Sequence, residues 1–80
     1  MGSSDPYGGQ IGDNTPLHKI DVASDTISYE GWAASGTATS EAKWLIKKIT
    51  ISGNITTETA AGGGTLHNQI WDNRSSLSYS

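Results

Sequence analysis

The sequence contains no cysteine, no phenylalanine and only two prolines among its 80 residues. The lack of cysteine excludes disulfide bonds and thiolate metal sites, which are common means of stabilising a small domain. No run approaches the roughly 18 apolar residues of a membrane-spanning helix. Lysine and arginine number five against eight acidic residues, so the clustered positive charge of a nucleic-acid-binding protein is missing. We therefore expect neither membrane nor nucleic-acid partners.

Large aliphatic residues are also scarce, since Ile, Leu and Val together number thirteen. An ordered chain loses on the order of 1.5 kcal/mol of conformational entropy per residue, so a small domain needs a rich core. The formal net charge is only −3, and the self-repulsion of a typical disordered chain is therefore absent. We expect one domain that gains stability by burying surface against copies of itself or against other proteins.

Residues 1–24 are rich in glycine and contain both prolines, so neither a helical nor a strand period persists there. The segment is predicted to form an extended arm in front of a β domain over residues 25–80. Its few apolar residues are spaced like points of contact with a neighbouring surface: Tyr7, Ile11, Leu17, Ile20 and Val22, of which Tyr7, Ile11 and Leu17 are the expected arm contacts. The alternative is a terminus that contacts nothing in solution. The opening residues also lack a secretory signal, so we expect a protein that is not exported.

Residues 25–33, DTISYEGWA, alternate in polarity and are rich in β-branched and aromatic residues. The pattern predicts a strand with Ile27 and Tyr29 on one face and Trp32 on the other. Gly31 interrupts the strand and indicates a bulge or a close approach of another segment. The small, polar residues 34–42 are expected to form a loop.

Residues 43–52, KWLIKKITIS, hold the densest apolar cluster of the chain. A helix with Ser40 as its N-cap is one interpretation, but the β-rich end of the segment favours a strand. In a regular strand, Trp44 and Ile46 would lie on the face opposite to Ile49 and Ile51. A β-bulge at the two lysines between them would bring all four to one side, and a strand buried on both faces would explain the pattern equally well.

Ser52-Gly53-Asn54 predicts a tight turn, followed by a strand over residues 55–60 that forms a hairpin. The run AAGGGT suits a loop. A short strand is expected around Ile70 and Trp71, then a turn at residues 72–74, then a last strand that includes Leu77. The predicted fold is all-β: an antiparallel sheet of four or five strands, curled into a small barrel or half-sandwich.

Residues that could carry chemistry form no recognised motif. His18 and His67 lack a metal-ligand spacing, no Gly-x-Ser-x-Gly elbow is present, and the triple glycine at residues 62–64 is followed by no lysine that could bind a phosphate. The carboxylates do not pair in sequence. We therefore expect no enzyme activity, no cofactor and no metal site.

Three tryptophans, Trp32, Trp44 and Trp71, are many for a chain this short. As the bulkiest apolar side chains they are expected in the core or at subunit contacts. A sugar-binding face is the alternative, because an indole ring can stack on a pyranose. The complete set of expected core or interface residues is Trp32, Trp44, Ile46, Ile49, Ile51, Ile70, Trp71 and Leu77.

The segments ISYEGWAASGTATSEAKWLIKKI (residues 27–49) and NQIWDNRSSLSYS (residues 68–80) resemble a family of short tailed-phage virion proteins. Family members share a Trp-x-Ile-basic-basic-Ile strand and close on Ile-Trp-Asp-Asn-Arg-x-Ser-Leu-x-Tyr. The match covers about fifty-five residues and carries no catalytic motif. The glycine-rich residues 60–65 depart from the acidic segment expected there, which puts a ligand role of that loop in doubt.

The resemblance implies a virion structural protein, made in the host cytoplasm. Together with the lean core it suggests a capsid-associated decoration or cement subunit that binds copies of itself and other virion proteins through β-sheet and arm contacts. A tail or fibre-adaptor component is the first alternative. A small carbohydrate-binding module is the second.

Overall fold

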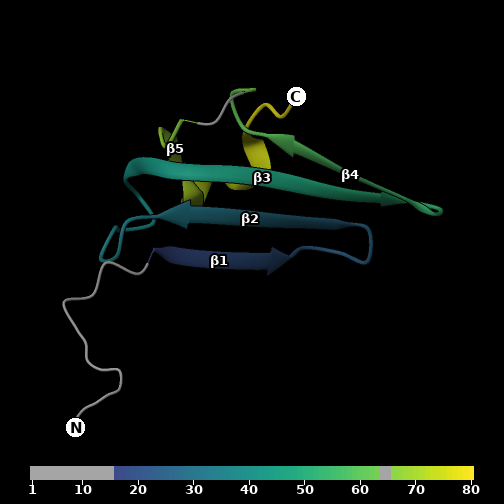
Figure 1. The fold of residues 1–80 in the computed structure, drawn as a ribbon, viewed down its shortest axis with the longest axis horizontal. Coiled ribbons are helices and arrows are strands. Elements are labelled where there is room, and N and C mark those ends of the chain that lie inside the picture. The colour runs from purple at the N-terminus through teal and green to yellow at the C-terminus, as the bar shows by residue number, and fades with distance from the viewer. Residues whose placement is uncertain (1–15, 64–65) are drawn as a thin grey trace, which may run out of the picture.

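A computed structural model describes residues 16–63 and 66–80. It contains five strands and one short helix (Figure 1). The strands are β1 (Leu17–Val22), β2 (Ile27–Ala33), β3 (Ala42–Ser52), β4 (Ile55–Ala60) and β5 (Gln69–Ile70), and they are followed by the 3-10 helix η2 (Trp71–Ser76). The expected all-β fold with an antiparallel sheet of four or five strands is confirmed.

The first four strands pair in chain order, β1-β2-β3-β4, and every neighbouring pair is antiparallel. β5 pairs with the first residues of β3, ahead of the part of β3 that pairs with β4. β3 is therefore hydrogen-bonded on both sides and forms the centre of the sheet. The predicted hairpin of β3 and β4 is confirmed, and its turn contains Gly53 with a φ of 60°, a conformation that favours glycine.

Alternation along the strands gives the sheet a covered face and an open face. The covered face carries the core, which contains Tyr29 and Ala33 from β2 and the fully buried Trp44 and Ile46 from β3. Trp71 from η2 packs on these residues, and its ring lies 5.7 Å from that of Trp44.

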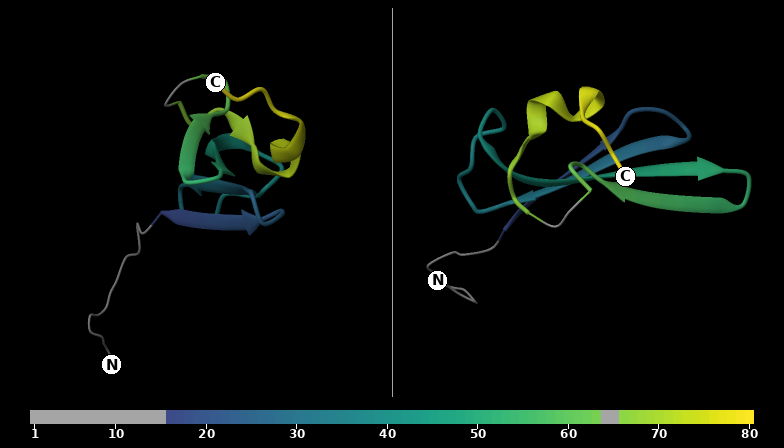
Figure 2. Two further views of the ribbon diagram at one scale, coloured as in Figure 1. Left: turned by 90° about the vertical axis from the view of Figure 1, so that its right-hand side faces the viewer. Right: turned by 90° about the horizontal axis from the view of Figure 1, so that it is seen from above.

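The C-terminal segment, residues 71–80, lies across the covered face and closes the core (Figure 2). Tyr79 packs beside Tyr29, with 5.9 Å between ring centroids, and Leu77 also contacts the core. Arg74 Nε donates a hydrogen bond of 2.9 Å to Asp21 Oδ2, which ties the segment to β1. No equivalent layer of described residues lies over the other face.

The arm expected over residues 1–24 is wrong in its last part. Residues 17–22 form β1, and Leu17 is a strand residue that packs against the core. The sequence LHKIDV alternates weakly, but all six residues pair with β2. The other expected arm contacts, Tyr7 and Ile11, lie outside the described residues.

The bulge expected at Lys47 and Lys48 is also wrong. Both lysines pair in unbroken register, Lys47 with Glu30 and Lys48 with Tyr29, and the register irregularity of β3 falls at Ala42/Trp44 opposite β5. A regular strand places Ile49 and Ile51 on the open face, away from the core, because side chains alternate strictly along an unbroken ladder.

The end of the chain differs from the expected turn and strand. Residues 71–76 form η2, and only an isolated bridge joins Tyr79 to Ala61. The predicted turn at residues 72–74 is therefore part of a longer element. A 3-10 helix consists of successive tight turns, and here the turn continues through Ser76. The Ser76 hydroxyl donates to the Asn73 carbonyl and supports this last part of the helix.

Candidate functional site

The open face of the sheet is the main surface left for a partner. It collects the side chains that alternate away from the core, in register across four strands. They are His18, Ile20 and Val22 of β1, Ser28, Glu30 and Trp32 of β2, Leu45, Lys47, Ile49 and Ile51 of β3, and Thr56, Glu58 and Ala60 of β4.

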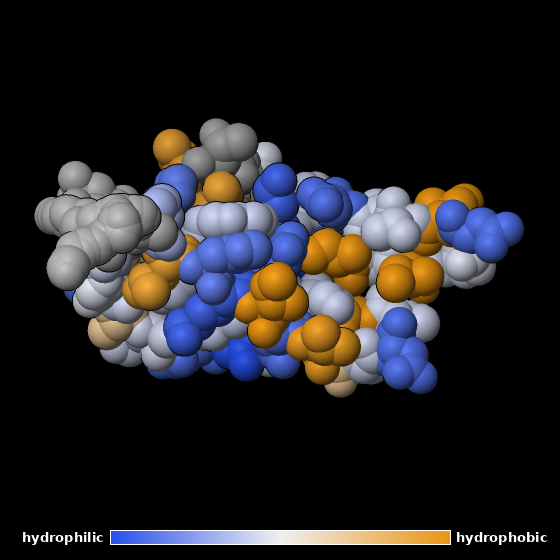
Figure 3. Space-filling view, turned by 60° about the horizontal axis from the view of Figure 1, so that its bottom comes forward, coloured by the Kyte–Doolittle hydropathy of each residue, from blue (hydrophilic) through white to orange (hydrophobic). Residues whose placement is uncertain are grey.

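Four aliphatic residues, which we call the apolar patch, gather toward the end of the open face that holds the β3–β4 turn (Figure 3). Ile20, Val22 and Ile51 are 60, 71 and 43% exposed, and Ile49 is half-buried. Single exposed aliphatic residues are common on protein surfaces. Here two of them lie on β1 and two on β3, the strands on either side of β2, and such a group on one sheet face is typical of an interaction surface.

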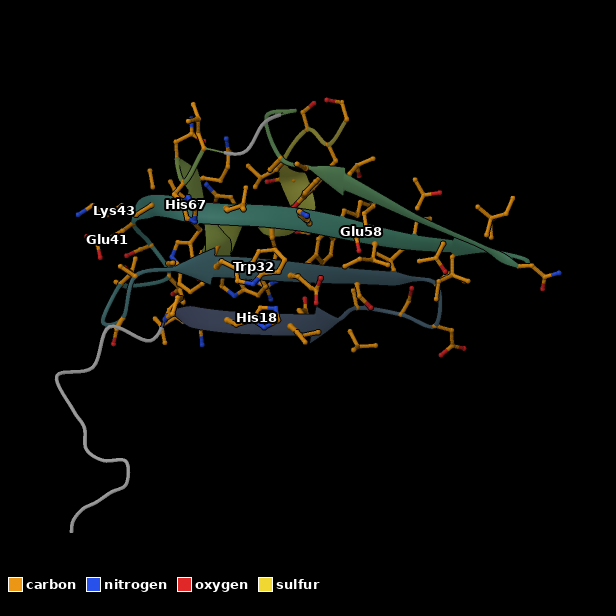
Figure 4. The ribbon with its side chains drawn as sticks, viewed as in Figure 1. His18, Trp32, Glu41, Lys43, Glu58 and His67 are labelled. Atoms are coloured by element: carbon orange, nitrogen blue, oxygen red, sulfur yellow. The ribbon has the colours of Figure 1, made fainter. Side chains whose placement is uncertain are left out.

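A row of polar and aromatic side chains crosses the middle of the open face (Figure 4). His18 stacks on Trp32 with 4.7 Å between ring centroids, and its Nε2 lies 3.5 Å from Glu30 Oε2. Lys47 lies over the same indole ring, 5.6 Å from its centroid, and also pairs with Glu58 at 3.6 Å. Side chains of both neighbouring strands thus contact the Trp32 ring.

A shallow groove of about 970 Å³ lies at the other end of the open face. Its lining includes Trp32, Leu45 and Lys47, together with the loop residues Ala34, Ser35 and Thr37 and with His67 from the segment before β5. The wall is more apolar than polar, and it brings together parts of the chain that are far apart in sequence. Nothing in the sequence pattern predicts this groove.

The loop beside the groove is held by hydrogen bonds to both backbone groups of Ala38, including one of 3.1 Å from the Glu41 N–H to the Ala38 carbonyl. The Ala38 N–H donates to Glu41 Oε1 at 2.8 Å, and the Trp44 indole Nε1 donates to the Ala38 carbonyl at 3.0 Å. The bond from Ala38, together with the nearby Lys43 ammonium, lowers the pKa of the Glu41 carboxyl. Glu41 therefore has a structural role here, and the helix considered for this segment does not form.

The two edges of the sheet differ. Ala23 directly follows β1, and its N–H donates to the carbonyl of Ile27 at the start of β2. Because hydrogen-bonded and non-bonded residues alternate along an antiparallel ladder, the odd-numbered residues of β1 exchange hydrogen bonds with β2. The backbone groups of His18, Ile20 and Val22 point outward instead. On β4, the end of the outer edge is occupied, because Ala60 and Ser80 exchange backbone hydrogen bonds. β1 is the more accessible edge.

The residues expected from sequence fall into two groups. Trp44, Ile46 and Trp71 are buried in the core, and Leu77 and Ile70 are half-buried near it. Trp32, Ile49 and Ile51 lie on the open face. Ile20 and Val22, which the sequence predicted as contact points of an extended arm, are exposed residues of β1, and their alternation with Lys19 and Asp21 is the signal for this strand.

Among residues 16–63 and 66–80, no group of three or more His, Cys, Asp or Glu side chains could hold a metal ion. No helix within the same ranges is long and apolar enough to cross a membrane.

Comparisons of the chain with models of protein families, with curated proteins and with solved structures found no match.

Proposed function

We propose that the chain is a structural subunit of a tailed-phage particle, a capsid-associated decoration or cement protein that binds its neighbours through the open face of its sheet. The observation that carries this proposal is the uncovered sheet face with its apolar patch. The choice of particle is supported by the resemblance of residues 27–49 and 68–80 to short phage virion proteins. In this proposal the subunit is made in the host cytoplasm and joins the virion.

The energetics of the fold support an assembly role. The described core holds only six buried residues, and two of them are alanines. A sheet covered on one face buries less apolar area than a two-layer domain, and each Å² of apolar surface removed from water contributes about 25 cal/mol. Covering Ile20, Val22 and Ile51 in an assembly would add such burial without any change in the fold.

The environments of the tryptophans favour this proposal over a carbohydrate-binding module. Trp44 and Trp71 are buried, so neither offers a flat indole face to a sugar. The Trp32 ring already contacts His18 and Lys47. A glycan-binding module would change tryptophan fluorescence when glycans are added, and we expect no such change.

Binding to purified particle parts tests the proposal. The chain is mixed with phage heads that have been emptied of DNA and freed of tails, and with isolated tails, and each mixture is sedimented. We expect the chain to sediment with the heads. Ile51→Asp should weaken this binding at least about tenfold, since a desolvated charge would replace an apolar contact.

Ile55→Asp is the matched control, because Ile55 is exposed at the same end of the hairpin but faces the other side of the sheet. It should bind heads like the unmodified chain. Sedimentation with tails alone would replace the decoration role by that of a tail component. Binding to neither part, or equal loss in both variants, would contradict the proposal.

A further inference from the structure

No segment among residues 16–63 and 66–80 pairs with the outer edge of β1, whose row of backbone groups lies beside exposed aliphatic side chains. The N–H and C=O groups of His18, Ile20 and Val22 point away from β2, as the ladder pattern requires. Ile20 and Val22 are also among the most exposed aliphatic residues described. Natural sheets normally protect such an edge with charges, prolines or a covering segment. Here the exposed side chains of two of the three outward-facing residues are apolar.

The sequence of β1 is complementary to itself in an antiparallel arrangement. When Ile20 faces Ile20 of a second copy, His18 faces Val22 and Lys19 faces Asp21 of the other chain. The Ile20–Ile20 pair and the two His18–Val22 pairs each exchange two backbone hydrogen bonds in a regular ladder. The two oppositely charged pairs add cross-strand attraction on the covered side.

Charge also selects this register against its neighbours. Because side chains alternate between the two faces, the second copy can slide along β1 only in steps of two residues if each side chain is to stay on its face. One such step in one direction places Lys19 directly opposite Lys19 of the second copy, and one step in the other direction places Asp21 opposite Asp21. Like charges directly opposite each other destabilise a sheet. The register centred on Ile20 avoids both.

The two charged residues are available for such pairs. Lys19 is exposed and forms no ion pair within the described part of the chain. Asp21 is half-buried and binds Arg74 through Oδ2. Its second carboxylate oxygen can accept a hydrogen bond from a lysine of another chain, because an ionised carboxylate accepts at both oxygens.

We infer that two copies of this chain pair through the outer edges of β1, antiparallel and centred on Ile20, so that strands β1 to β4 of both copies form one continuous sheet. The two-fold axis places both apolar patches on the same side, so the open face doubles in size. The inference deepens the proposed function, because it names the partner and edge with which the assembly starts, but self-pairing can be measured without any particle.

Engineered disulfides test the register, since the chain has no cysteine of its own. In Ile20→Cys the two Cα atoms would lie about 5.5 Å apart across the axis, within the range of a disulfide. Val22→Cys is the matched control on the same strand and face, and there the two positions would be about 13 Å apart. Ile20→Cys should form the intermolecular disulfide at least tenfold faster.

A second pair of variants tests the backbone bonds. Ile20→Pro removes an outward N–H that β2 does not use, and proline is tolerated at such an edge position. Thr56→Pro removes the equivalent outward N–H of β4. Sedimentation equilibrium should show a dimer for the unmodified chain and for Thr56→Pro, and at least tenfold weaker association for Ile20→Pro.

The results separate this inference from the proposed function. A chain that stays monomeric at millimolar concentration, or whose two cysteine variants react equally fast, would overturn the β1 dimer even if it binds heads. A chain that dimerises as predicted but binds neither heads nor tails would retain the dimer and remove the virion role.

Discussion

At the scale of single residues, the core depends on a missing side chain. Gly31 of β2 lies directly beneath the indole of Trp71 and also contacts that of Trp44. A Cβ at this position would be 2.5 Å from Trp71 Cε3 and 3.1 Å from Trp44 Cε3. The sequence predicted either a bulge or a close approach of another segment at Gly31. The structure shows the close approach, made by two tryptophan rings, and the strand register at Gly31 is unbroken.

Gly31→Ala is expected to destabilise the fold by about 1–3 kcal/mol, because the added methyl group would displace a ring in a well-packed core. Urea unfolding followed by tryptophan fluorescence measures the change. Ser28→Ala, in the same strand but on the open face, is the control and should shift the free energy of unfolding by less than about 0.5 kcal/mol. An unchanged midpoint for Gly31→Ala would show that Trp71 does not occupy this position.

The phenol of Tyr79 gives the fold a sensitivity to alkaline pH. Burial, with a smaller contribution from Tyr29, raises the pKa of Tyr79 to about 12 from its ordinary value of 10.0. The hydroxyl donates a hydrogen bond of 2.7 Å to the Arg74 carbonyl, which only the neutral form can do. The folded state thus holds this proton more tightly than the unfolded state.

The stability contributed by this difference is complete below pH 10 and is lost as the pH rises toward 12. Because Tyr79 is only partly buried and solvent screens its environment, we expect a loss of about 1 kcal/mol. Denaturant melts at a series of pH values measure it. Tyr79→Phe should be less stable near neutral pH and should show a flatter decline over this interval; an identical decline would assign the effect to another group.

At the scale of elements, η2 is held to the sheet by its arginine. Arg74 bonds Asp21 of β1, lies over the Trp71 ring at 4.6 Å and donates to the Trp71 carbonyl at 3.2 Å. The Asp72 N–H also donates to the Thr39 carbonyl in the loop before β3. The helix is thus attached to β1 through Arg74 and to the loop before β3 through Asp72.

Arg74→Ala should destabilise the protein by about 1–3 kcal/mol, because a partly buried, charge-assisted hydrogen bond is lost and Asp21 is left without its partner. Chemical denaturation is the measurement. Lys43→Ala removes an ion pair to Glu41 that is largely exposed, so it should cost no more than about 0.5 kcal/mol. Equal effects of the two substitutions would argue against the docking role of Arg74.

The elements that sequence predicted correctly are those with strong local signals. Residues 25–33 alternate clearly, and the turn at Gly53 sets the β3–β4 hairpin. β1 was missed because its apolar Ile20 and Val22 face the open side, opposite to the usual pattern. The bulge was predicted from the assumption that all apolar residues of β3 share one core. An exposed apolar patch violates that assumption.

At the scale of the whole molecule, the candidate site was predictable only in part. The density of apolar residues in β3 marked Trp44 and Ile46 as core residues, and the scarcity of aliphatic side chains pointed to partners. The groove and the free edge of β1 arise from strand register and from the path of the C-terminal segment. Neither follows from local composition, since each depends on residues distant in sequence.

The chain order of the strands has a consequence for the rate of folding. β1 to β4 each pair with the next strand along the chain, so the connecting loops are short and their closure costs little entropy. An all-β protein of this kind has a lower contact order than a sandwich with long crossovers, and it should fold correspondingly faster. The contact between Arg74 and Asp21, 53 residues apart, closes a much longer loop and therefore carries a larger entropic cost.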